Sequence, residues 1–304
     1  MLNSETLEAR RKGIGGSDAA KVLGLSRWGG AYSVWADKVL GQSKELDSEA
    51  VYWGNVLEET VAQEFARREG LEVIPRNEIF HSAELPFMLA NIDRQIVGQN
   101  IGLECKTASA FKAGEWDGDN LPDEYYVQVQ HYCFVMGWIG CWIACLVGGQ
   151  RFIHKFVPRN DAFIKDMCEQ ELNFWGNYVL TQTPPPLNET DKVIIAQSSD
   201  ELLTPTESDF NTAAKLVTVN AQIKELEAHK KLLENKLKLR IGENAGIEGV
   251  ATYKKIKDSI KTDWAALCDG EGISSETIAK YSHIQEGYRR FLLKFKEVKS
   301  DGNS

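Results

Sequence analysis

The sequence predicts an α/β (α+β) fold in which a central mixed, mainly antiparallel sheet is flanked by helices, with a helical extension at the C-terminal end. Two observations support this prediction. Helical patterns punctuated by glycine up to residue 70 are followed by short segments with strand patterns. Helices and strands do not alternate regularly after that point, so a layered sheet is favoured over a repeated βα unit.

The N-terminal part is predicted to be helical because polar and apolar residues alternate at helical spacing between glycines. Gly41 and Gly70 each follow such a segment, and glycine is the usual residue just beyond the last turn of a helix. Helices are expected over residues 5–12, 17–23, 32–40 and 49–68.

The middle part is predicted to form the sheet. Strands are expected over 71–75, 78–82, 88–98, 101–107, 142–147 and 152–157. Residues 98–100 and 148–150 are rich in glycine and would connect two hairpins. Helices over 123–136 and 161–180 would cover the sheet. A first domain over residues 1–182 follows.

The composition changes at the three prolines of residues 184–186, and a linker is expected over 183–206. The remaining part, 207–304, is predicted to hold one long helix, 207–241, and a small α/β tail with a basic end at 289–299. The helix is predicted from a seam that steps by three and four, and six of its eight positions are apolar. The seam consists of Leu216, Val219, Ile223, Leu226, Lys230, Leu233, Leu237 and Arg240.

Composition and charge exclude several classes of protein. The net charge of -9 in 304 residues argues against a broad basic surface for nucleic acid, although a small basic groove remains compatible with it. The six cysteines lack paired CxxC spacing and are expected to be reduced core residues. No apolar run reaches the length of a membrane span, so we expect a cytoplasmic protein without a membrane partner.

The most informative residues lie around one predicted hairpin. Asp93 belongs to its first strand, and Glu104 and Lys106 share one face of the second because side chains alternate along a strand. Antiparallel pairing would place Asp93 beside Glu104. Two carboxylates with one ammonium group are what Mg²⁺-dependent hydrolysis of a phosphodiester needs, with the backbone carbonyl of Cys105 as a further metal ligand. The alternative is an exposed pattern of charges that includes Arg94.

Three further segments accompany the D-x10-E-x-K pattern in order along the chain. They are GIGGSDAAKVLG at 13–24, GNVLEETVAQEF at 54–65 and QVQHY at 128–132. Together, over residues 8–180, they resemble the YqaJ family of phage-type exonucleases, which are relatives of bacteriophage lambda exonuclease within the PD-(D/E)xK nuclease superfamily. The resemblance implies a restriction-endonuclease-like core and a nuclease domain over residues 1–182.

The resemblance implies roles for two residues outside the hairpin. Glu58 would contribute to the metal site, directly or through a second ion or a water molecule. Gln130, the second glutamine of QVQ, would position the attacking water or Lys106. Each has a structural alternative, because Glu58 beside Glu59 can be ordinary surface charge on a helix and Gln130 can be a buried amide bonded to backbone.

The resemblance also implies a pocket for a 5′-phosphate near the start of the chain. Ser17 and Gly16 would form it together with Arg10 or Arg11, and Lys12 competes for the same role. A serine before Asp18 is also a good N-cap, so capping is the structural alternative for Ser17.

The function that the resemblance implies is digestion of duplex DNA from a phosphorylated 5′ end in the 5′→3′ direction. Mg²⁺ would be the cofactor, with Mn²⁺ as a possible substitute. The 3′ single strand would pass to a single-strand annealing recombinase, and the enzyme would be a homotrimeric ring. A restriction-like or structure-specific endonuclease is one alternative, and a non-catalytic DNA-end-binding module is another. For the C-terminal helix, an oligomer seam, a DNA-facing arm and an intramolecular hairpin all stay open.

Overall fold

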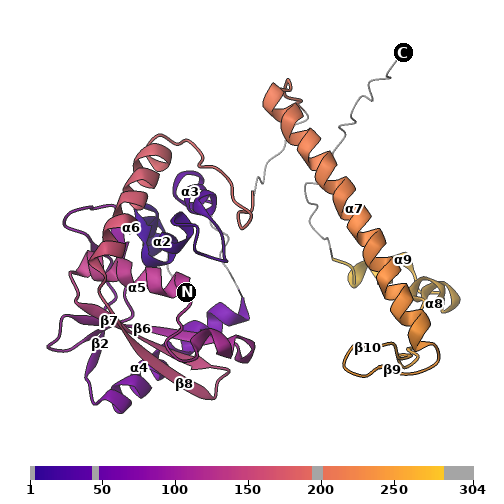
Figure 1. The fold of residues 1–304 in the computed structure, drawn as a ribbon, viewed down its shortest axis with the longest axis horizontal. Coiled ribbons are helices and arrows are strands. Elements are labelled where there is room, and N and C mark those ends of the chain that lie inside the picture. Colours follow the sequence, from indigo (N-terminus) through magenta and orange to yellow (C-terminus); the bar gives the residue numbers. More distant parts are fainter. Residues whose placement is uncertain (1–3, 43–47, 194–200, 284–304) are drawn as a thin grey trace. The chain divides into compact units, whose positions relative to one another are not determined.

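The computed structural model describes residues 4–42, 48–193 and 201–283, which fall into two units, 1–195 and 196–304. Figure 1 shows the elements of both units. The helices of the first unit are α1 (Ser4–Arg11), α2 (Gly16–Val22), α3 (Ala31–Leu40), α4 (Glu49–Glu69), α5 (Asp123–Met136) and α6 (Asp161–Phe174), with the 3-10 segment η1 (Ala110–Trp116) and the π-helical turn η2 (Trp175–Val179).

Eight strands of the first unit form two sheets. The larger sheet has the order β2-β5-β6-β7-β8 and consists of β2 (Val73–Pro75), β5 (Arg94–Ile96), β6 (Ile101–Ala108), β7 (Gly140–Val147) and β8 (Arg151–Pro158). The smaller sheet has the order β1-β4-β3 and consists of β1 (Ile14–Gly15), β3 (Phe80–His81) and β4 (Met88–Ala90). In the larger sheet all neighbours are antiparallel except β6 and β7. The predicted mixed, mainly antiparallel sheet flanked by helices is confirmed.

The central strands β6 and β7 are buried on both faces because helices cover the sheet from two sides (Figure 1). On one face, Val61 and Phe65 of α4 pack against Leu103 and Cys105 of β6. On the other face, Val129 of α5 belongs to the larger cluster that surrounds the rest of β7. Strands with both faces covered lose the alternation of apolar and polar residues, and the sequence of β7 is accordingly apolar throughout.

The parallel pairing of β6 with β7 follows from the crossover through α5, which the sequence pattern alone did not indicate. Gly102 permits this crossover to close against the sheet. A Cβ atom at Gly102 would lie only 1.9 Å from Cζ3 of Trp138, which stands at the end of the crossover and is buried. A larger residue at this position would have to displace a tryptophan ring from the core.

The single strand predicted over 88–98 is wrong in one respect. The chain forms β4 in the smaller sheet, leaves it at 91–93, and then enters the larger sheet as β5. Asp93 therefore lies in the connection immediately before β5 and not inside a strand. The physical reason is that the two halves of this segment pair with strands of two different sheets. A strand pattern in the sequence does not show with which strands a segment will pair.

The polar segment after η2 is held against the first unit. Asp191 accepts hydrogen bonds from the backbone N–H groups of Gly30 and Ser33 at 2.8 and 3.2 Å, at the N-terminus of α3. Asn188 lies so close to Gly30 that a Cβ at that glycine would meet it. The structured part of the first unit thus continues into the segment expected as a linker.

The second unit contains α7 (Glu207–Ile241), β9 (Gly246–Ile247), β10 (Ala251–Thr252), α8 (Trp264–Gly270) and α9 (Ser275–Lys280). The helix expected over 207–241 is α7, and Thr206 caps it in a reciprocal pair with Asp209. Seam residues such as Ile223 and Leu226 are exposed. The basic segment 289–299 lies outside the described residues.

The six cysteines all lie in the described ranges and form no disulfide. No helix in the described part of the chain is both long and apolar enough to span a membrane.

Candidate active site

The structure brings Asp93 and Glu104 together at the junction of β5 and β6. The register pairs Arg94 with Leu103, which places Asp93 opposite Glu104. Asp93 Oδ2 accepts a hydrogen bond of 2.8 Å from the backbone N–H of Cys105. The carboxylate of Asp93 thereby continues the pairing of the two strands beyond the last backbone pair of β5.

Glu104 is the centre of the cluster and its side chain is 4% exposed. Its Oε1 accepts a hydrogen bond of 2.6 Å from Nζ of Lys106 and one of 2.8 Å from Nε2 of Gln128. Its Oε2 is buried and has no hydrogen-bond partner among the described residues. A buried carboxylate oxygen without a donor carries a desolvation cost that a bound cation would offset.

The charges of the cluster favour a cation as well. Burial and the neighbouring charge of Glu104 raise the pKa of Asp93 well above its ordinary value of 3.8. Burial lowers the pKa of Lys106, but the carboxylates of Glu104 and Asp93 outweigh it and the net pKa is raised, so Lys106 is an ammonium ion at neutral pH. One ammonium group faces two carboxylates, and an additional positive charge at this place would favour the ionised form of Asp93.

The donor set fits a hard divalent cation. Carboxylate and carbonyl oxygens are the ligands that Mg²⁺ prefers, and Mg²⁺ usually binds through one or two carboxylates and keeps several waters. Asp93, Glu104 and the carbonyl of Cys105 provide that kind of set. Among the described residues, no group of three or more His, Cys, Asp and Glu side chains is close enough to hold a metal. In the described part of the chain, the site therefore consists of two carboxylate side chains and does not surround a cation with protein ligands.

Lys106 is held between its carboxylate partner and an aromatic ring. Its Nζ lies 5.0 Å from the centroid of the Tyr125 ring, and its side chain is 20% exposed. The ring restricts the ammonium group to the side of β6 that faces α5, where Glu104 also lies. The predicted common face of Glu104 and Lys106 is thus present.

Gln128, not Gln130, reaches the carboxylates. Gln128 Nε2 donates to Glu104 and, at 2.9 Å, to the hydroxyl of Tyr132, and the Tyr132 hydroxyl donates at 2.8 Å to the carbonyl of Asn91. Gln130 instead donates to the carbonyl of Pro158 and accepts from the backbone N–H of Asn160. The structure therefore does not bring Gln130 to the site, in agreement with its alternative as a buried amide.

A signal for this difference exists in the sequence. On an α-helix, residues three and four positions apart share a face, so Tyr125, Gln128 and Tyr132 project together while Gln130 points about 200° away from Gln128. Tyr125 precedes this pair by one turn and covers Lys106. Because residues two positions apart on a helix point in nearly opposite directions, only one of the two glutamines can face the strand that carries Glu104.

Glu58 lies near the cluster but is bonded elsewhere. Its Oε1 accepts a hydrogen bond of 2.7 Å from Nη1 of Arg94, and Glu59 accepts one of 2.7 Å from Nη2 of the same guanidinium. The charge of Glu58 contributes to the raised pKa of Asp93, though less than burial and Glu104 do. The structure places Glu58 next to the carboxylates without joining it to them.

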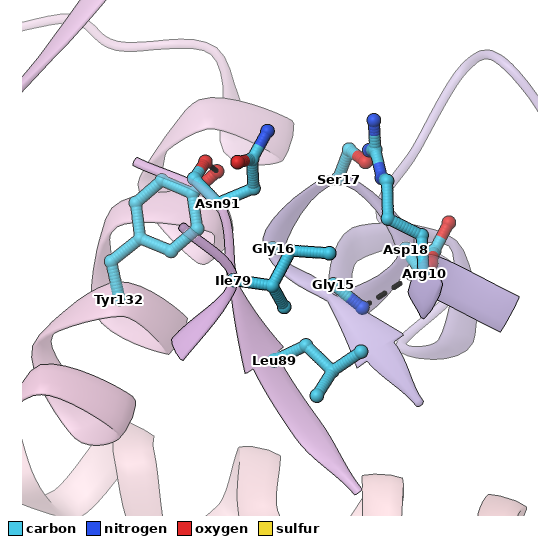
Figure 2. A pocket seen from close by; sticks show the side chains of 9 residues that line it. All are labelled: Arg10, Gly15, Gly16, Ser17, Asp18, Ile79, Leu89, Asn91 and Tyr132. Carbon is cyan, nitrogen blue, oxygen red and sulfur yellow. Dashed lines mark hydrogen bonds between the residues drawn. The ribbon is translucent and has the colours of Figure 1, made fainter. Parts of the chain in front are cut away.

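A small pocket lies beside the cluster, between the start of α2 and the smaller sheet (Figure 2). Its lining contains three of the four residues expected for a 5′-phosphate, Arg10, Gly16 and Ser17, together with Asn91 and Tyr132. The last two belong to the hydrogen-bonded chain that ends on Glu104. The pocket and the two carboxylates are therefore connected through side chains.

Gly16 permits α2 to approach α5 at this point. A Cβ at Gly16 would lie 2.6 Å from Cε1 of Tyr132 and 3.1 Å from Cγ of Gln128. Ser17 does not cap α2, because the helix begins at Gly16 and Gly15 occupies the cap, where its N–H donates to Asp18 at 3.3 Å. The capping alternative for Ser17 is wrong, and its exposed side chain borders the pocket.

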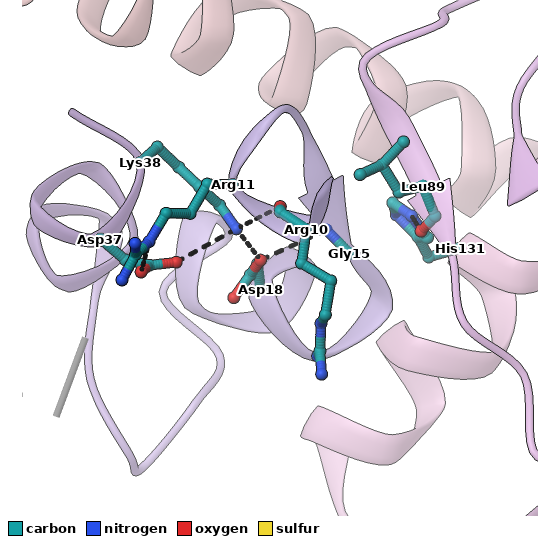
Figure 3. Close-up of polar contacts among 8 residues, drawn as sticks. All are labelled: Arg10, Arg11, Gly15, Asp18, Asp37, Lys38, Leu89 and His131. Carbon is teal, nitrogen blue, oxygen red and sulfur yellow. Dashed lines mark hydrogen bonds and ion pairs between the residues drawn. The ribbon is translucent and has the colours of Figure 1, made fainter. Parts of the chain in front are cut away.

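Arg11 does not join the pocket. Its Nε donates to Asp37 of α3 at 3.1 Å (Figure 3). Its Nη2 donates at 3.0 Å to the carbonyl of Gly41, the residue that caps the end of α3. Lys38 is buried nearby and pairs with Asp18 at 2.8 Å while it donates to the carbonyl of Arg10. This pair fixes the end of α1 to α2 and leaves Arg10 as the arginine that lines the pocket (Figure 2).

His131 does not line the pocket, but it is bonded to a residue that does. Its ring is fully buried, with Nε2 donating to the carbonyl of Leu89 at 2.9 Å and Nδ1 lying 3.0 Å from Glu171 Oε1. Leu89 is paired with Gly15 in the smaller sheet. The histidine therefore anchors the strand that carries one wall of the pocket (Figure 3).

Comparison with known proteins gives one family. The family described as the YqaJ-like viral recombinase domain matches residues 5–138. A relative from Bacillus subtilis (strain 168), described as the uncharacterized protein YqaJ, is 35% identical over 307 residues, which cover 97% of this chain and 95% of the relative.

Solved structures show the same fold. The alkaline exonuclease LHK-Exo from Laribacter hongkongensis is similar with a TM-score of 0.51 and 14% identity, and its complex with dAMP with a TM-score of 0.52 and 16% identity. Each comparison covers 60% of this chain and 94% of the other.

Proposed function

We propose that this chain, which belongs to the YqaJ-like viral recombinase family, is a Mg²⁺-dependent deoxyribonuclease that digests duplex DNA from a 5′-phosphorylated end. The observation that carries the proposal is the pair Asp93 and Glu104, placed opposite each other with Lys106 bonded to one of them. The fold shared with LHK-Exo, an alkaline exonuclease that was also crystallised with dAMP, supports the same reaction class.

Each residue of the cluster has a chemical task in phosphodiester hydrolysis. Asp93, Glu104 and the Cys105 carbonyl would hold the cation, which when bound lowers the pKa of a water ligand and offsets charge on the phosphate. Lys106, whose ammonium group is bonded to Glu104, would orient the attacking water and stabilise negative charge on the phosphate. Gln128 fixes the rotamer of Glu104 through its 2.8 Å bond.

The pocket supports recognition of a 5′ end. Arg10 supplies positive charge, Ser17 a hydroxyl group and Gly16 a backbone N–H, three kinds of group that bind phosphate. Because Tyr132 lies both in the pocket lining and in the chain to Glu104, a terminal phosphate bound there would lie next to the carboxylates. Digestion would then proceed 5′→3′ and leave a 3′ single strand for an annealing recombinase.

A homotrimeric ring is part of this proposal. Enclosure keeps the enzyme on DNA between successive cuts, and cyclic symmetry closes head-to-tail contacts. The net charge of -9 is compatible with a positive channel formed from one face of each subunit.

One experiment tests the function. Purified protein is incubated with Mg²⁺ and linear duplexes that carry a labelled 5′-phosphate, a 5′-hydroxyl or covalently closed ends, and a parallel set contains EDTA. We expect nucleotides to be released fastest from the phosphorylated end, with no reaction on closed ends or with EDTA. Cuts in the closed substrate would indicate the endonuclease alternative, and binding of ends without cleavage would indicate the end-binding module. Lys106→Met, which lacks the ammonium group but keeps a side chain of similar length, is the matched inactive control.

A further inference from the structure

The long helix α7 carries an apolar stripe that is exposed. Its 35 residues form a helix about 52 Å long, and of its side chains, all of which are described, only Ile241 is buried. Five apolar residues of the seam are between 40% and 66% exposed: Val219, Ile223, Leu226, Leu233 and Leu237. Helices in proteins obtain most of their stability by packing an apolar face, so this stripe is suited to a partner.

The width of the stripe indicates what kind of partner fits it. The seam alternates steps of three and four residues from Leu216 to Arg240, which are the a and d positions of a heptad. The positions on either side of it, g and e, are polar: Gln222, His229 and Lys236 at g, and Asn220, Glu227 and Glu234 at e. A helix that packs on a globular core has a wider apolar face, whereas a stripe confined to a and d fits a second helix.

The charges beside the seam favour a second copy of α7 in parallel. In a parallel pair each g residue lies beside the e residue five positions later on the other helix. His229 would then lie beside Glu234 of the other copy and Gln222 beside Glu227, and none of the g–e pairs along the seam joins like charges. In an antiparallel pair e faces e, so glutamates of the two copies would meet.

Lys230 interrupts the apolar seam at one a position. A single polar residue at such a position lowers the stability of a coiled coil but fixes its register, because other registers would place the lysine against apolar residues. Glu227 and Glu234 lie three residues before and four residues after Lys230. Its ammonium group is thus within reach of a carboxylate at the edge of the seam while its aliphatic part stays inside.

We propose that α7 is a self-association helix, which forms a parallel coiled coil with α7 of other copies of this chain. The occupant of the seam is therefore a second copy and not DNA or the first unit. The inference goes beyond the proposed nuclease function and is carried by α7 alone. It agrees with the proposed ring, because cyclic symmetry gives every copy of α7 the same direction along the symmetry axis.

Disulfide cross-linking of the full-length protein tests both the pairing and its direction. Val219→Cys places a thiol at a d position near one end of the seam. A parallel coil brings the two thiols together, and a disulfide needs Cα atoms about 4.4–6.8 Å apart. Thr218→Cys is the matched control, because the neighbouring residue is also exposed but lies off the seam.

Each protein is oxidised at micromolar concentration with copper–phenanthroline, and covalent dimers are measured by gel electrophoresis without reductant. The unsubstituted chain gives the background from the native cysteines. Leu233→Asp and Leu232→Asp are each added to Val219→Cys, since Leu233 lies in the seam and Leu232, equally apolar and exposed, lies outside it.

We expect Val219→Cys to form the covalent dimer at least about tenfold faster than Thr218→Cys. Leu233→Asp should slow this bond by about tenfold, because an unpaired carboxylate enters the seam two heptads away, and Leu232→Asp should not. Equal rates for the two thiols, or equal effects of the two aspartates, would overturn the inference. An antiparallel pair, packing of the seam on its own chain and a DNA-facing arm would each give equal rates.

The same proteins separate this inference from the proposed function. Reduced Val219→Cys should release nucleotides from duplex ends at the rate of the unsubstituted chain, because α7 belongs to the second unit. Cleavage without preferential cross-linking would refute the coiled coil alone. Preferential cross-linking without cleavage would refute the nuclease alone.

Discussion

Gln128 Nε2 donates a hydrogen bond of 2.8 Å to Glu104 Oε1, while Gln130, two residues along the same helix, bonds only backbone groups of Pro158 and Asn160. Two glutamines in one motif thus have different partners. One holds a carboxylate of the proposed metal site, and the other ties α5 to the end of β8 and the start of α6.

This difference separates activity from stability. Gln128→Ala should lower the rate of cleavage by about 10- to 100-fold, because a partner that orients a metal ligand is removed. Gln130→Ala should leave the rate unchanged at a temperature where the protein is folded, but lower the free energy of unfolding by about 1–3 kcal/mol, since the fully buried side chain and its two hydrogen bonds to backbone are lost. Nuclease assays and urea unfolding of both variants measure the two effects. A larger loss of activity in Gln130→Ala would refute the assignment.

The three residues of the cluster should be individually essential. Asp93→Asn and Glu104→Gln should abolish cleavage, and Lys106→Met should reduce it by about 10²- to 10³-fold. Burial and Glu104 raise the pKa of Asp93, so its ionisation at pH 7 opposes folding, and Asp93→Asn should therefore raise the melting temperature. Calorimetry in EDTA checks this second effect. A melting temperature below that of the unsubstituted protein would show that repulsion between the Asp93 and Glu104 carboxylates does not destabilise the folded state.

Two adjacent glycines provide a steric test of the pocket. Gly16→Ala places a Cβ 2.6 Å from the Tyr132 ring and should cost about 1–3 kcal/mol of unfolding free energy, with loss of end recognition. Gly15→Ala is the control, because the nearest atom to its Cβ is 3.8 Å away and its φ of -88° suits any residue. Denaturant unfolding should show a smaller loss for this control, on the order of 0.5–1 kcal/mol, because alanine is a poorer N-cap than glycine. Equal effects at both positions would exclude the steric explanation.

Acid should weaken the contact between α2 and α3. Burial raises the pKa of Asp18, but Lys38 and other cations outweigh it and lower the pKa to about 2 from 3.8. Because the folded pKa is the lower one, the stabilisation of about 2 kcal/mol is present above pH 4 and is lost as the pH falls toward 2. Lys38→Met should therefore destabilise the protein at pH 7 and much less at pH 2.5, as measured by urea unfolding. Arg151→Met, in an exposed pair, should show no such pH dependence.

The assembly prediction is a homotrimer. Light scattering of the full-length protein at micromolar concentration should give three times the mass of 34.1 kDa. When the enzyme is first bound to long duplexes and then diluted into an excess of competitor DNA, it should continue to digest the duplexes to which it is already bound. A monomer that shows the same persistence would refute the ring.

The chemistry of the site could be predicted because it depends on local rules. The two-residue period of a strand places Glu104 and Lys106 on one face, and a hairpin with its turn at Gly98 brings Asp93 opposite Glu104. These relations require only neighbours in sequence. The long helix α7 was predictable for the same reason.

What could not be predicted depends on partners far along the chain. The division of 88–98 between two sheets is decided by β1, more than 70 residues earlier, which pairs with β4 in parallel. The choice between Gln128 and Gln130 depends on how α5 is rotated over β6. Arg94 appeared in the sequence as one member of a charge pattern, and its bonds to Glu58 and Glu59 follow only from the approach of α4.

The hydrogen bond from Cys105 N–H to Asp93 Oδ2 has a consequence for experiments in solution. A side chain, and not a neighbouring strand, protects this amide proton, so its exchange with deuterium should follow the carboxylate and not the opening of the sheet. Amide protons of β7, shielded by backbone partners on both sides, should exchange only when the sheet itself opens. The exchange rate of one amide therefore reports on whether the carboxylate of Asp93 is bonded to that amide, and it does so without substrate or turnover.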